Sequence, residues 1–385
     1  MKSPLLALPP HLTAINWYPG HQAKALRDIT QRLLPTTALV VEVRDARVPR
    51  SSRNPTLEAA LAAKGVPRVV VLNKADVADA AQTRAWAARI RSSERGVVDV
   101  VSSAREARSG LWRVVHRARA LADTNPLAPP PTVLLVGAPN TGKSTLLNTL
   151  RNLAIPHRGR AAAVGGVPGV TRVVSATKVL LSESPKVYMY DAPGILDPGW
   201  HIGRASTLTR NGGRSDDPAD PEQAMVEDVD ALYHKALAIE RGYRVAAVGC
   251  VKDAVAGADR VFEYVVRLSA SRAQLPALEA ALRVSVTDPS APAWAGIDPV
   301  LDDIARRLGA RGAGGTLDRE RAAMWALGVW RRGAAGALSV DLVEEAEDGG
   351  VDDEAMAAAA AAKSNSGKSR SSRSSSSSRS PSSKR

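Results

Sequence analysis

The stretch that decides the fold is Pro131-Thr-Val-Leu-Leu-Val-Gly-Ala-Pro-Asn-Thr-Gly-Lys-Ser-Thr145. Its apolar run at residues 133–136 predicts a buried strand, and leucines then follow at helical spacing. A Gly-x-x-x-x-Gly-Lys-Ser motif between a strand and a helix is typical of a phosphate-binding loop. The alternative, a glycine-rich turn that matches by chance, is disfavoured by the flanking strand and helix. The stretch therefore predicts nucleotide binding.

The physical basis is a backbone that curls around an anion. Glycines allow successive N–H groups to point inward, and the N-terminus of the following helix adds partial positive charge. Lys143 would reach the β and γ phosphates, and the Ser144 hydroxyl would ligate Mg²⁺. The residues of this loop predicted to line the nucleotide are Asn140, Thr141, Gly142, Lys143, Ser144 and Thr145.

The chain has 385 residues, which is long enough for two domains and a tail. Its formal net charge is +13, and residues 341–385 hold 8 acidic and 7 basic residues, so the first 340 residues carry +14. A folded body this basic indicates a polyanionic partner such as RNA, or an anionic lipid surface. Simple solubility is the alternative explanation.

Cysteine content and hydropathy exclude several classes. The single cysteine, Cys250, excludes an intramolecular disulfide and a cysteine-rich metal site, which fits a reducing compartment. No run of 18 apolar residues exists, so no transmembrane helix is expected. Residues 1–16 make a poor Arg-rich presequence, so the sequence does not reveal its targeting.

Strand-like and helix-like segments alternate along the first half of the chain. A cap at Asn54-Pro55 predicts a helix through Leu61, and further helices are expected at 82–91 and 111–121. Strands are expected at 37–43, 66–72, 97–101, 133–136, 175–181 and 186–190. This alternation predicts an α/β fold with a doubly wound, mostly parallel sheet.

The composition also divides the chain into segments. We expect an N-terminal extension (1–14), a nucleotide-binding domain (15–203), a polar linker or insertion (204–221), a small α-helical domain (222–343) and a disordered Ser/Arg-rich tail (344–385).

Asn73-Lys-Ala-Asp76 follows a predicted strand, where open α/β sheets bind ligands. The tetrapeptide resembles the guanine-specificity motif of GTPases. The Asp76 carboxylate would accept from N1–H and the exocyclic amine of guanine, and adenine offers neither donor at those positions. Asn73 would bridge the base site to the phosphate loop, and the Lys74 stem would cover the ring. Ser103 and Ala104, after the next strand, would supply backbone contacts to the guanine oxygen.

Asp191-Ala-Pro-Gly194 ends another predicted strand. Asp191 would hold Mg²⁺ through water, and the Gly194 N–H would bind the γ-phosphate. Thr171, in a glycine-rich stretch, would complete the Mg²⁺ shell, although an ordinary loop threonine is the alternative. Both segments would become ordered with GTP and relax after hydrolysis.

The order of these motifs is unusual. Ordinary GTPases carry the phosphate loop first and the guanine-reading motif later, whereas here residues 73–104 precede residues 137–194. The arrangement looks like a circularly permuted GTPase domain, in which the same sheet is opened at another place. The segment after Gly194 would then act directly on the C-terminal helical domain.

Within that class, three segments resemble the circularly permuted ribosome biogenesis GTPase A family, which includes mitochondrial ribosome-associated members. They are Ile15-Asn-Trp-Tyr-Pro-Gly-His21, Val41-Glu-Val-Arg-Asp-Ala-Arg-Val-Pro-Arg-Ser-Ser-Arg-Asn-Pro55 and Pro168-Gly-Val-Thr171. Departures include Gln22 where the family usually has Met, and Ala192 where it usually has Thr.

The resemblance implies a GTP-driven assembly factor for the large ribosomal subunit whose C-terminal domain helps to hold rRNA. It favours the mitochondrial matrix, with association at the matrix face of the inner membrane left open. A plastid, the cytoplasm and the nucleolus remain alternative compartments.

Hydrolysis needs a group other than the usual glutamine, because Ile195 occupies the position where Ras-like enzymes orient water. Asn140 is predicted to help hold a K⁺ ion that neutralises developing charge. The family resemblance suggests His21 as the residue that positions water, and a helix-capping or packing role is the alternative. We expect slow GTP hydrolysis that ribosomal particles and K⁺ accelerate.

Two other functional classes stay open at this point. One is a P-loop ATPase or kinase, which the binding of GDP but not ADP would exclude. The other is a nucleotide-gated RNA-binding scaffold in which hydrolysis is incidental.

Overall fold

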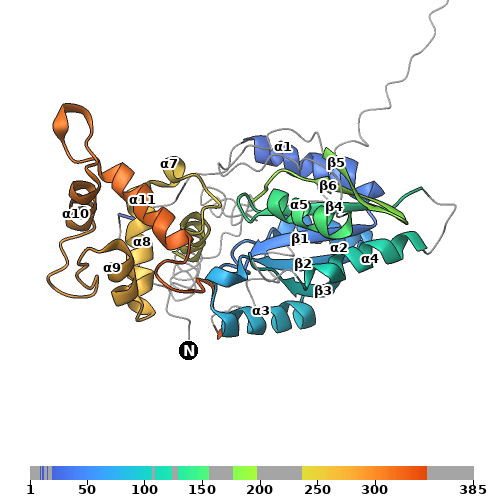
Figure 1. Ribbon diagram of the computed structural model, residues 1–385, viewed down its shortest axis with the longest axis horizontal. Helices are drawn as coiled ribbons and strands as arrows, with labels where there is room; N and C mark the ends of the chain where they lie inside the picture. Colours follow the sequence, from blue (N-terminus) through green and yellow to red (C-terminus); the bar gives the residue numbers. More distant parts are fainter. Residues whose placement is uncertain are drawn as a thin grey trace, which may run out of the picture.

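The computed structural model describes residues 9, 11–12, 15, 20–105, 109–123, 129–155, 177–196 and 236–344. An α/β region and a helical region lie side by side, at the right and left of Figure 1 respectively. The predicted linker 204–221 lies outside the described residues, as do all of the predicted tail beyond Glu344 and most of the predicted N-terminal extension.

A six-stranded sheet forms the centre of the α/β region, in the order β3-β2-β1-β4-β6-β5. Its strands are β1 (Leu39–Asp45), β2 (Arg68–Asn73), β3 (Val97–Ser102), β4 (Thr132–Gly137), β5 (Thr177–Glu183) and β6 (Lys186–Asp191). Neighbouring strands are parallel except for β5, which pairs antiparallel with β6 along an edge of the sheet. The predicted α/β fold with a mostly parallel sheet is thereby confirmed.

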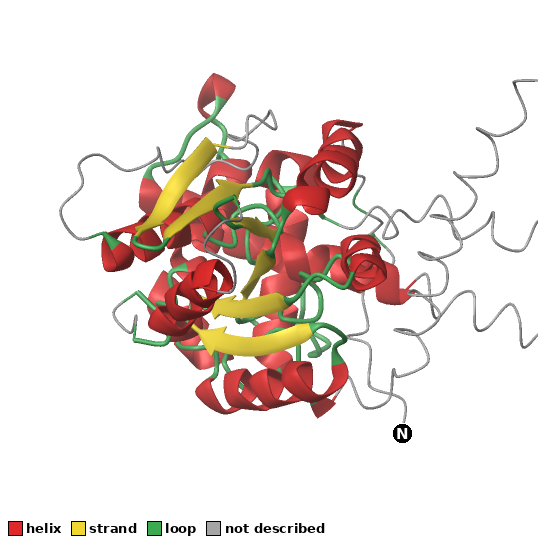
Figure 2. Cartoon of the chain, turned by 90° about the vertical axis from the view of Figure 1, so that its right-hand side faces the viewer, coloured by secondary structure: helices red, strands yellow, loops and turns green. Residues whose placement is uncertain are grey.

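Helices cover both faces of this sheet (Figure 2). Alternate apolar residues of β1 such as Val41 pack with α4 (Leu111–Asp123) and α5 (Lys143–Ala154). The intervening residues, such as Val40, pack with α1 (Gly20–Asp28) and α2 (Pro55–Lys64). The helix α3 (Ala80–Ser93) buries Trp86 and Ile90 against β2 and β3. The two-residue period of the strands therefore gives the sheet two buried faces.

Local capping sets the ends of the helices. The Asn54 side chain accepts a hydrogen bond from the Leu57 N–H at 2.9 Å, and Gly65 ends α2 in the left-handed region. Asp79 caps α3 by accepting from the Gln82 N–H at 2.8 Å. Shorter turns are η1 (Ile29–Leu33), η2 (Leu34–Thr36), η3 (Ala75–Val77) and η6 (Ala313–Gly315). The predicted Asn54 cap is thus present, with its helix continuing three residues beyond Leu61.

The helical region begins with a helix over residues 236–247. It continues through α7 (Asp253–Ala256), α8 (Ala258–Ser271), α9 (Leu275–Leu282), α10 (Asp298–Leu308) and α11 (Arg319–Arg331). Its core centres on α8, where Phe262 is fully buried and Tyr264 stacks on Tyr243 with ring centroids 5.7 Å apart. Among the described residues, no helix is long and apolar enough to cross a membrane.

The topology fixes where a ligand would bind. The strand order runs outward in one direction from β1 and in the other from β4, so these adjacent strands form the switch point of the sheet. Ligands of open α/β sheets bind beyond the carboxyl ends of the strands at such a point. Asp45 ends β1, Asn73 ends β2 and Gly137 ends β4.

Candidate functional site

The phosphate loop connects β4 to α5, and close contacts restrict it to the residues it has. A Cβ on Gly137 would lie 2.2 Å from the Val43 carbonyl oxygen, and one on Gly142 would lie 2.4 Å from Asn73 Nδ2. Both glycines have positive φ, as does Asn140 at 57°. The loop therefore has the curled backbone that its sequence predicts.

Lys143 lies in the first turn of α5 with its ammonium group turned into the loop. Its Nζ donates to the carbonyl oxygens of Ala138 at 2.8 Å and Gly137 at 3.2 Å. Burial lowers the pKa of Lys143 to about 8, against the opposing effect of Asp191. An anion within the loop would favour the charged form of this side chain. Lys143 is placed to bind phosphate, and without phosphate the charge of its buried ammonium group is poorly compensated.

Ser144 and Asp191 meet beside Lys143. The Ser144 hydroxyl donates to Asp191 Oδ2 at 2.8 Å, whereas Oδ1 is buried and has no hydrogen-bond partner among the residues that the structure describes. Burial raises the pKa of Asp191 above its usual value. Hard divalent cations prefer hydroxyl, carboxylate and phosphate oxygens, so this pair fits the predicted Mg²⁺ site.

The base-reading motif contacts the phosphate loop directly. Asn73 Nδ2 donates to the Thr141 carbonyl at 2.7 Å, and Lys74 Nζ donates to the Asn140 carbonyl at 2.6 Å. The first of these bonds joins residues that are 68 positions apart in the chain, and the second joins residues that are 66 positions apart. The two halves of the predicted nucleotide site lie together.

The remaining base-reading residues surround the end of β3. The Ala75 N–H donates to the Ser103 carbonyl at 3.0 Å, so the two predicted base-contacting loops are bonded together. Asp76 is exposed, and its Oδ1 accepts from the Arg105 N–H at 3.4 Å. Ala104, which lies between Ser103 and Arg105 in the chain, is half-buried. The Asp76 carboxylate is thus available to a base at the surface.

Behind Lys74 lies a residue that the motifs did not single out. Asp45 is fully buried, and its Oδ2 lies 2.9 Å from Lys74 Nζ and 2.8 Å from an Arg47 nitrogen. Burial alone would raise the pKa of Asp45, but Arg47 and Lys74 hold it well below its usual range. The Asp45 carboxylate therefore stays ionised and fixes the position of the Lys74 ammonium group. Two signals for Asp45 were available in the sequence, its place just after a predicted strand and its membership of the resembling segment 41–55, but neither assigned it a role.

The segment after β6 packs against the phosphate loop. A Cβ on Gly194 would lie 2.6 Å from Pro139 Cα, and the Ile195 N–H donates to the Gly137 carbonyl at 3.2 Å. The Ile195 side chain is buried, so it has no access to water. Gln22, a departure from the family pattern, accepts from the Leu196 N–H through its side chain at 3.0 Å.

Four other predicted residues have different outcomes. Thr145 is exposed on α5, and the Thr141 hydroxyl donates to the Ala138 carbonyl within the loop at 2.9 Å. Thr171 lies outside the described residues. His21 follows the first residue of α1, and its side chain is not among those described.

Asn140 connects the phosphate loop to the helical region. Its Nδ2 donates to the Gly249 carbonyl at 2.8 Å. A second connection is Asp341, which is buried and accepts from the backbone and hydroxyl of Ser51 at 2.7 and 2.6 Å. Arg244 pairs with the same carboxylate at 3.1 Å. The helical region therefore contacts both the phosphate loop and the segment after β1.

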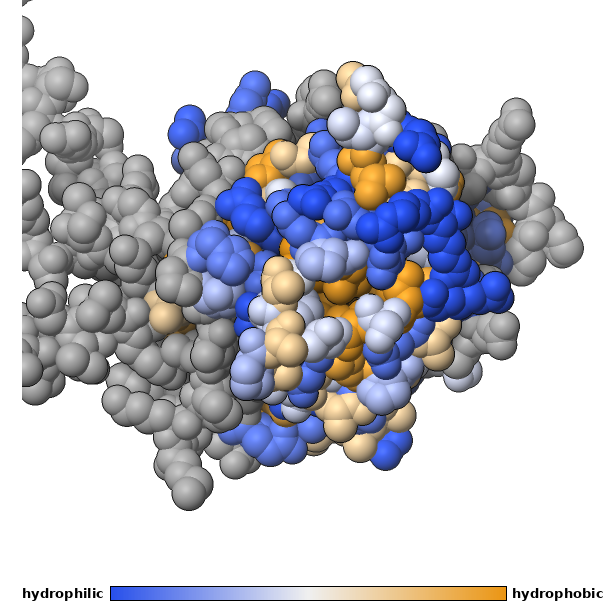
Figure 3. Space-filling view, turned by 90° about the vertical axis from the view of Figure 1, so that its left-hand side faces the viewer, coloured by the Kyte–Doolittle hydropathy of each residue, from blue (hydrophilic) through white to orange (hydrophobic). Residues whose placement is uncertain are grey.

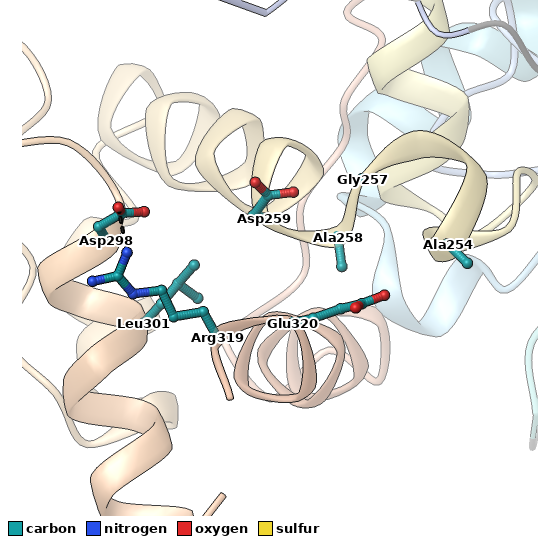
Figure 4. Close-up of a pocket in the computed structure, with 8 residues that line it drawn as sticks. All are labelled: Ala254, Gly257, Ala258, Asp259, Asp298, Leu301, Arg319 and Glu320. Atoms are coloured by element: carbon teal, nitrogen blue, oxygen red, sulfur yellow. Dashed lines mark hydrogen bonds and ion pairs between the residues drawn. The ribbon is translucent and has the colours of Figure 1, made fainter. Parts of the chain in front are cut away.

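A separate surface pocket of about 420 Å³ lies within the helical region (Figure 4). Arg319 points across it and pairs with Asp298 and Asp302. The lining residues are Ala254, Gly257, Ala258, Asp259, Asp298, Leu301, Arg319 and Glu320. It contains none of the residues that the motifs single out, so the nucleotide site lies elsewhere.

Comparisons with known proteins identify several that are similar to this chain. Residues 132–231 match the family model described as "50S ribosome-binding GTPase". The chain is 32% identical over 261 residues to Short integuments 2, mitochondrial, from Arabidopsis thaliana, covering 66% of this chain and 56% of that protein. It is 35% identical over 188 residues to Mitochondrial ribosome-associated GTPase 1 from Xenopus tropicalis, covering 48% and 58% respectively.

A bacterial relative matches over a longer range. The chain is 29% identical over 344 residues to Ribosome biogenesis GTPase A from Priestia megaterium, covering 86% of this chain and 98% of that protein. A crystal structure of GNP-bound YlqF from T. maritima aligns with a TM-score of 0.45 and 22% identity, covering 83% of this chain and 98% of that one. The chain spans a little over half the length of the plant and frog relatives. The resemblance predicted from the motifs is confirmed by these names.

Proposed function

We propose that this chain binds GTP, hydrolyses it to GDP and phosphate, and assists assembly of a large ribosomal subunit. The observation that carries this proposal is the direct contact of the base-reading and phosphate-reading motifs. Asn73 and Lys74 donate to the carbonyls of Thr141 and Asn140, so one nucleotide can contact both motifs. The names of the relatives support the ribosomal role.

The chain's own residues supply most of the phosphate site. Lys143 would exchange its two loop carbonyls for phosphate oxygens, and the backbone N–H groups of the loop would bind the same charge. Ser144 and Asp191, whose Oδ1 has no hydrogen-bond partner in the described part of the chain, would hold Mg²⁺ together with Thr171. When bound, that ion neutralises charge developing on the phosphate oxygens.

Guanine specificity would come from Asp76, with backbone contacts from Ser103 and Ala104. The exposed Asp76 carboxylate accepts one backbone N–H at 3.4 Å and keeps further acceptor capacity for two guanine donors. Asp45 fixes Lys74 by an ion pair of 2.9 Å, and the Lys74 stem would then cover the base. An adenine base would leave the Asp76 carboxylate unpaired.

Hydrolysis would depend on groups other than Ile195, whose side chain is buried. We assign water positioning to His21 and part of a K⁺ site to Asn140. The Asn140 side chain also binds the helical region through Gly249, so nucleotide and cation binding would affect that contact. Hydrolysis is expected to be slow alone and faster with K⁺ and large subunits; equal rates in K⁺ and Na⁺, with and without subunits, would contradict both effects.

The helical region (222–343 by our proposed boundaries) would bind rRNA in the GTP state and release it after hydrolysis. Figure 3 shows this end of the molecule, where strongly hydrophilic residues border apolar ones. Arg306, Arg307 and Arg311 are exposed near Leu308, which is 39% exposed. We place the protein in mitochondria, as the names of several relatives indicate, with membrane-surface association as a further possibility.

Sedimentation tests partner and compartment together. The tagged protein is mixed with purified mitochondrial, plastid or cytosolic large subunits and either a non-hydrolysable GTP analogue or GDP. We expect co-sedimentation with mitochondrial large subunits in the analogue and much less in GDP. Equal amounts in the pellet with both nucleotides would contradict a nucleotide-controlled assembly factor.

A further inference from the structure

The solvent face of α4 carries an aromatic pair between two arginines. Trp112 is 38% exposed, and its ring lies 5.9 Å from that of His116, with the planes at 39°. Arg113 and Arg117 lie beside this pair on the next positions of the helix, with side chains 55% and 48% exposed. We call these four residues the α4 stripe.

The arginines of the α4 stripe are only partly neutralised. Both pair with one carboxylate, that of Asp99 on the edge strand β3. Arg117 also donates to the Val98 carbonyl at 3.1 Å, on the outer edge of the sheet. Between Ser109 and Ala122 every charged residue is an arginine. Two guanidinium groups that share one carboxylate leave a net positive surface around the aromatic pair.

Packing does not explain the tryptophan. The inner face of α4 is complete without it, because Leu111, Val114 and Val115 are fully buried. Arg117 can be explained by its charge, which protects the edge strand β3 from pairing with another chain. The same explanation gives no reason for the large exposed ring of Trp112. A helix whose solvent face combines aromatic rings with partly neutralised arginines has the chemistry that binds stacked bases and phosphates.

We propose that the α4 stripe binds unpaired nucleotides of an RNA. A base stacks on Trp112 beside His116, while Arg113 and Arg117 bind the flanking phosphates. Single-stranded RNA fits better than a duplex, because only unpaired bases expose a face to an aromatic side chain. The helix α4 lies at the side of the α/β region that faces away from the helical region (Figure 1). A structured RNA could thus be held at two separate places.

Binding of short RNAs to the full chain tests this. A fluorescein-labelled, uridine-rich RNA of about ten nucleotides, sized to one stacking platform, is compared with a duplex of equal length by fluorescence anisotropy. The variants are Trp112→Ala and the double change Arg113→Ala/Arg117→Ala. Conservative partners are Trp112→Phe and Arg113→Lys/Arg117→Lys. Arg84→Ala, at an exposed position on α3, is the matched control. Far-UV circular dichroism and the midpoint of urea unfolding report on folding.

We expect Trp112→Ala to weaken single-strand binding by at least about fivefold, and Trp112→Phe to restore most of it. The double alanine variant should lower the dependence of log Kd on log salt by about one to two units, whereas the lysine pair should not. Crosslinking of 4-thiouridine RNA to a peptide containing Trp112 would support the site without any substitution.

Three results would overturn the proposal. One is unchanged single-strand affinity in both alanine variants when both are folded, which would point to a protein contact instead. The second is an equal loss for duplex and single strand, which would remove the role of stacking. The third is the absence of any crosslink at the stripe. These three results do not depend on GTP hydrolysis or on ribosome binding. The RNA site on α4 and the proposed GTPase function can therefore fail separately.

Discussion

Two buried charge clusters begin at consecutive residues of β1 and point to opposite faces of the sheet. Arg44 is fully buried, and it bonds Glu42 and Glu94 at 2.7 Å and Glu58 at 3.1 Å. The rest of this closed cluster is Arg53 and Arg68, which pair with the same carboxylates. Three arginines thus face three glutamates between the sheet and its helices.

The cluster around Asp45 is open at both ends. Lys74, with 30% of its side chain exposed, leads from Asp45 to the nucleotide site. Arg47 leads the other way, since it donates to the Arg331 carbonyl at 3.2 Å and lies 5.5 Å from the Trp330 ring of α11. We call Asp45, Arg47 and Lys74 the bridging cluster.

The difference between these clusters indicates separate roles. The closed cluster is balanced in charge, and the ion pairs described for it lie within the α/β region, so removing a member should affect folding. The bridging cluster has one carboxylate for two cations and contacts a predicted ligand site and a second region. Its removal should affect nucleotide binding and the link to the helical region as well as stability.

The largest effect is expected from Arg44→Ala. The change leaves the buried Glu42 and the half-buried Glu58 and Glu94 without their shared partner, and it should lower the free energy of unfolding by about 3–5 kcal/mol. Urea unfolding followed by tryptophan fluorescence measures it. The GDP affinity of the folded protein should stay within about twofold of the wild-type value. That difference is small, because a tenfold change in affinity corresponds to about 1.4 kcal/mol. A decrease of less than about 1 kcal/mol in the free energy of unfolding would show that the closed cluster contributes no more than exposed ion pairs do.

Asp45→Asn should have a smaller effect on stability and a clear effect on binding. Arg47 and Lys74 lose a charged acceptor, which should cost about 1.5–3 kcal/mol in unfolding free energy. GDP affinity should fall by about tenfold, since Lys74 loses its fixed position. Calorimetry measures this, with Glu42→Gln as the matched change in the closed cluster. Equal GDP affinities in the two variants would remove the distinction drawn between the clusters.

The lysine of the phosphate loop gives a pH-dependent prediction. The pKa of Lys143 is lowered to about 8 in the free protein, and bound phosphates should raise it. Below pH 8 the side chain is charged in both states, so GDP affinity should vary little through this group. Above pH 8 binding requires proton uptake, and affinity should fall by up to about tenfold per pH unit. Lys143→Arg should remove this slope.

The smallest effect is expected at the contact between the phosphate loop and the helical region. Asn140→Ala removes one hydrogen bond to Gly249, worth about 1 kcal/mol. Amide exchange near residues 246–250 should become about fivefold faster, while exchange in β4 stays unchanged. Uniform acceleration throughout the chain would show a general loss of stability, and no link through this contact.

The sequence predicts those features that depend on neighbouring residues. The Asn54 cap, the glycine-rich loop and the alternating strands are local patterns, and the structure contains each. The strand order β3-β2-β1-β4-β6-β5 was not predicted, because parallel crossover connections leave several orders open. The ends of strands were less accurate, since Asp45 and Asn73 belong to β1 and β2 and the predicted strands stop before them.

Contacts between distant residues could not be predicted. Asp341 lies 290 positions from Ser51, and nothing near it in the sequence indicates a buried carboxylate. The Asp45 to Lys74 pair and the Asn140 to Gly249 bond have the same character. They depend on which loops the sheet order brings together. The predicted roles of His21 and Thr171 stay predictions.

The central claim is that the base-reading loop ahead of the phosphate loop selects guanine through Asp76. The most direct measurement is calorimetric binding of GDP, ADP and xanthosine diphosphate to wild type and to Asp76→Asn. Xanthine replaces the exocyclic amine of guanine with a carbonyl, to which an asparagine amide can donate. Wild type should bind GDP at least about 10³-fold more tightly than the others, and Asp76→Asn should prefer xanthosine diphosphate. Unchanged GDP preference in Asp76→Asn would contradict the account.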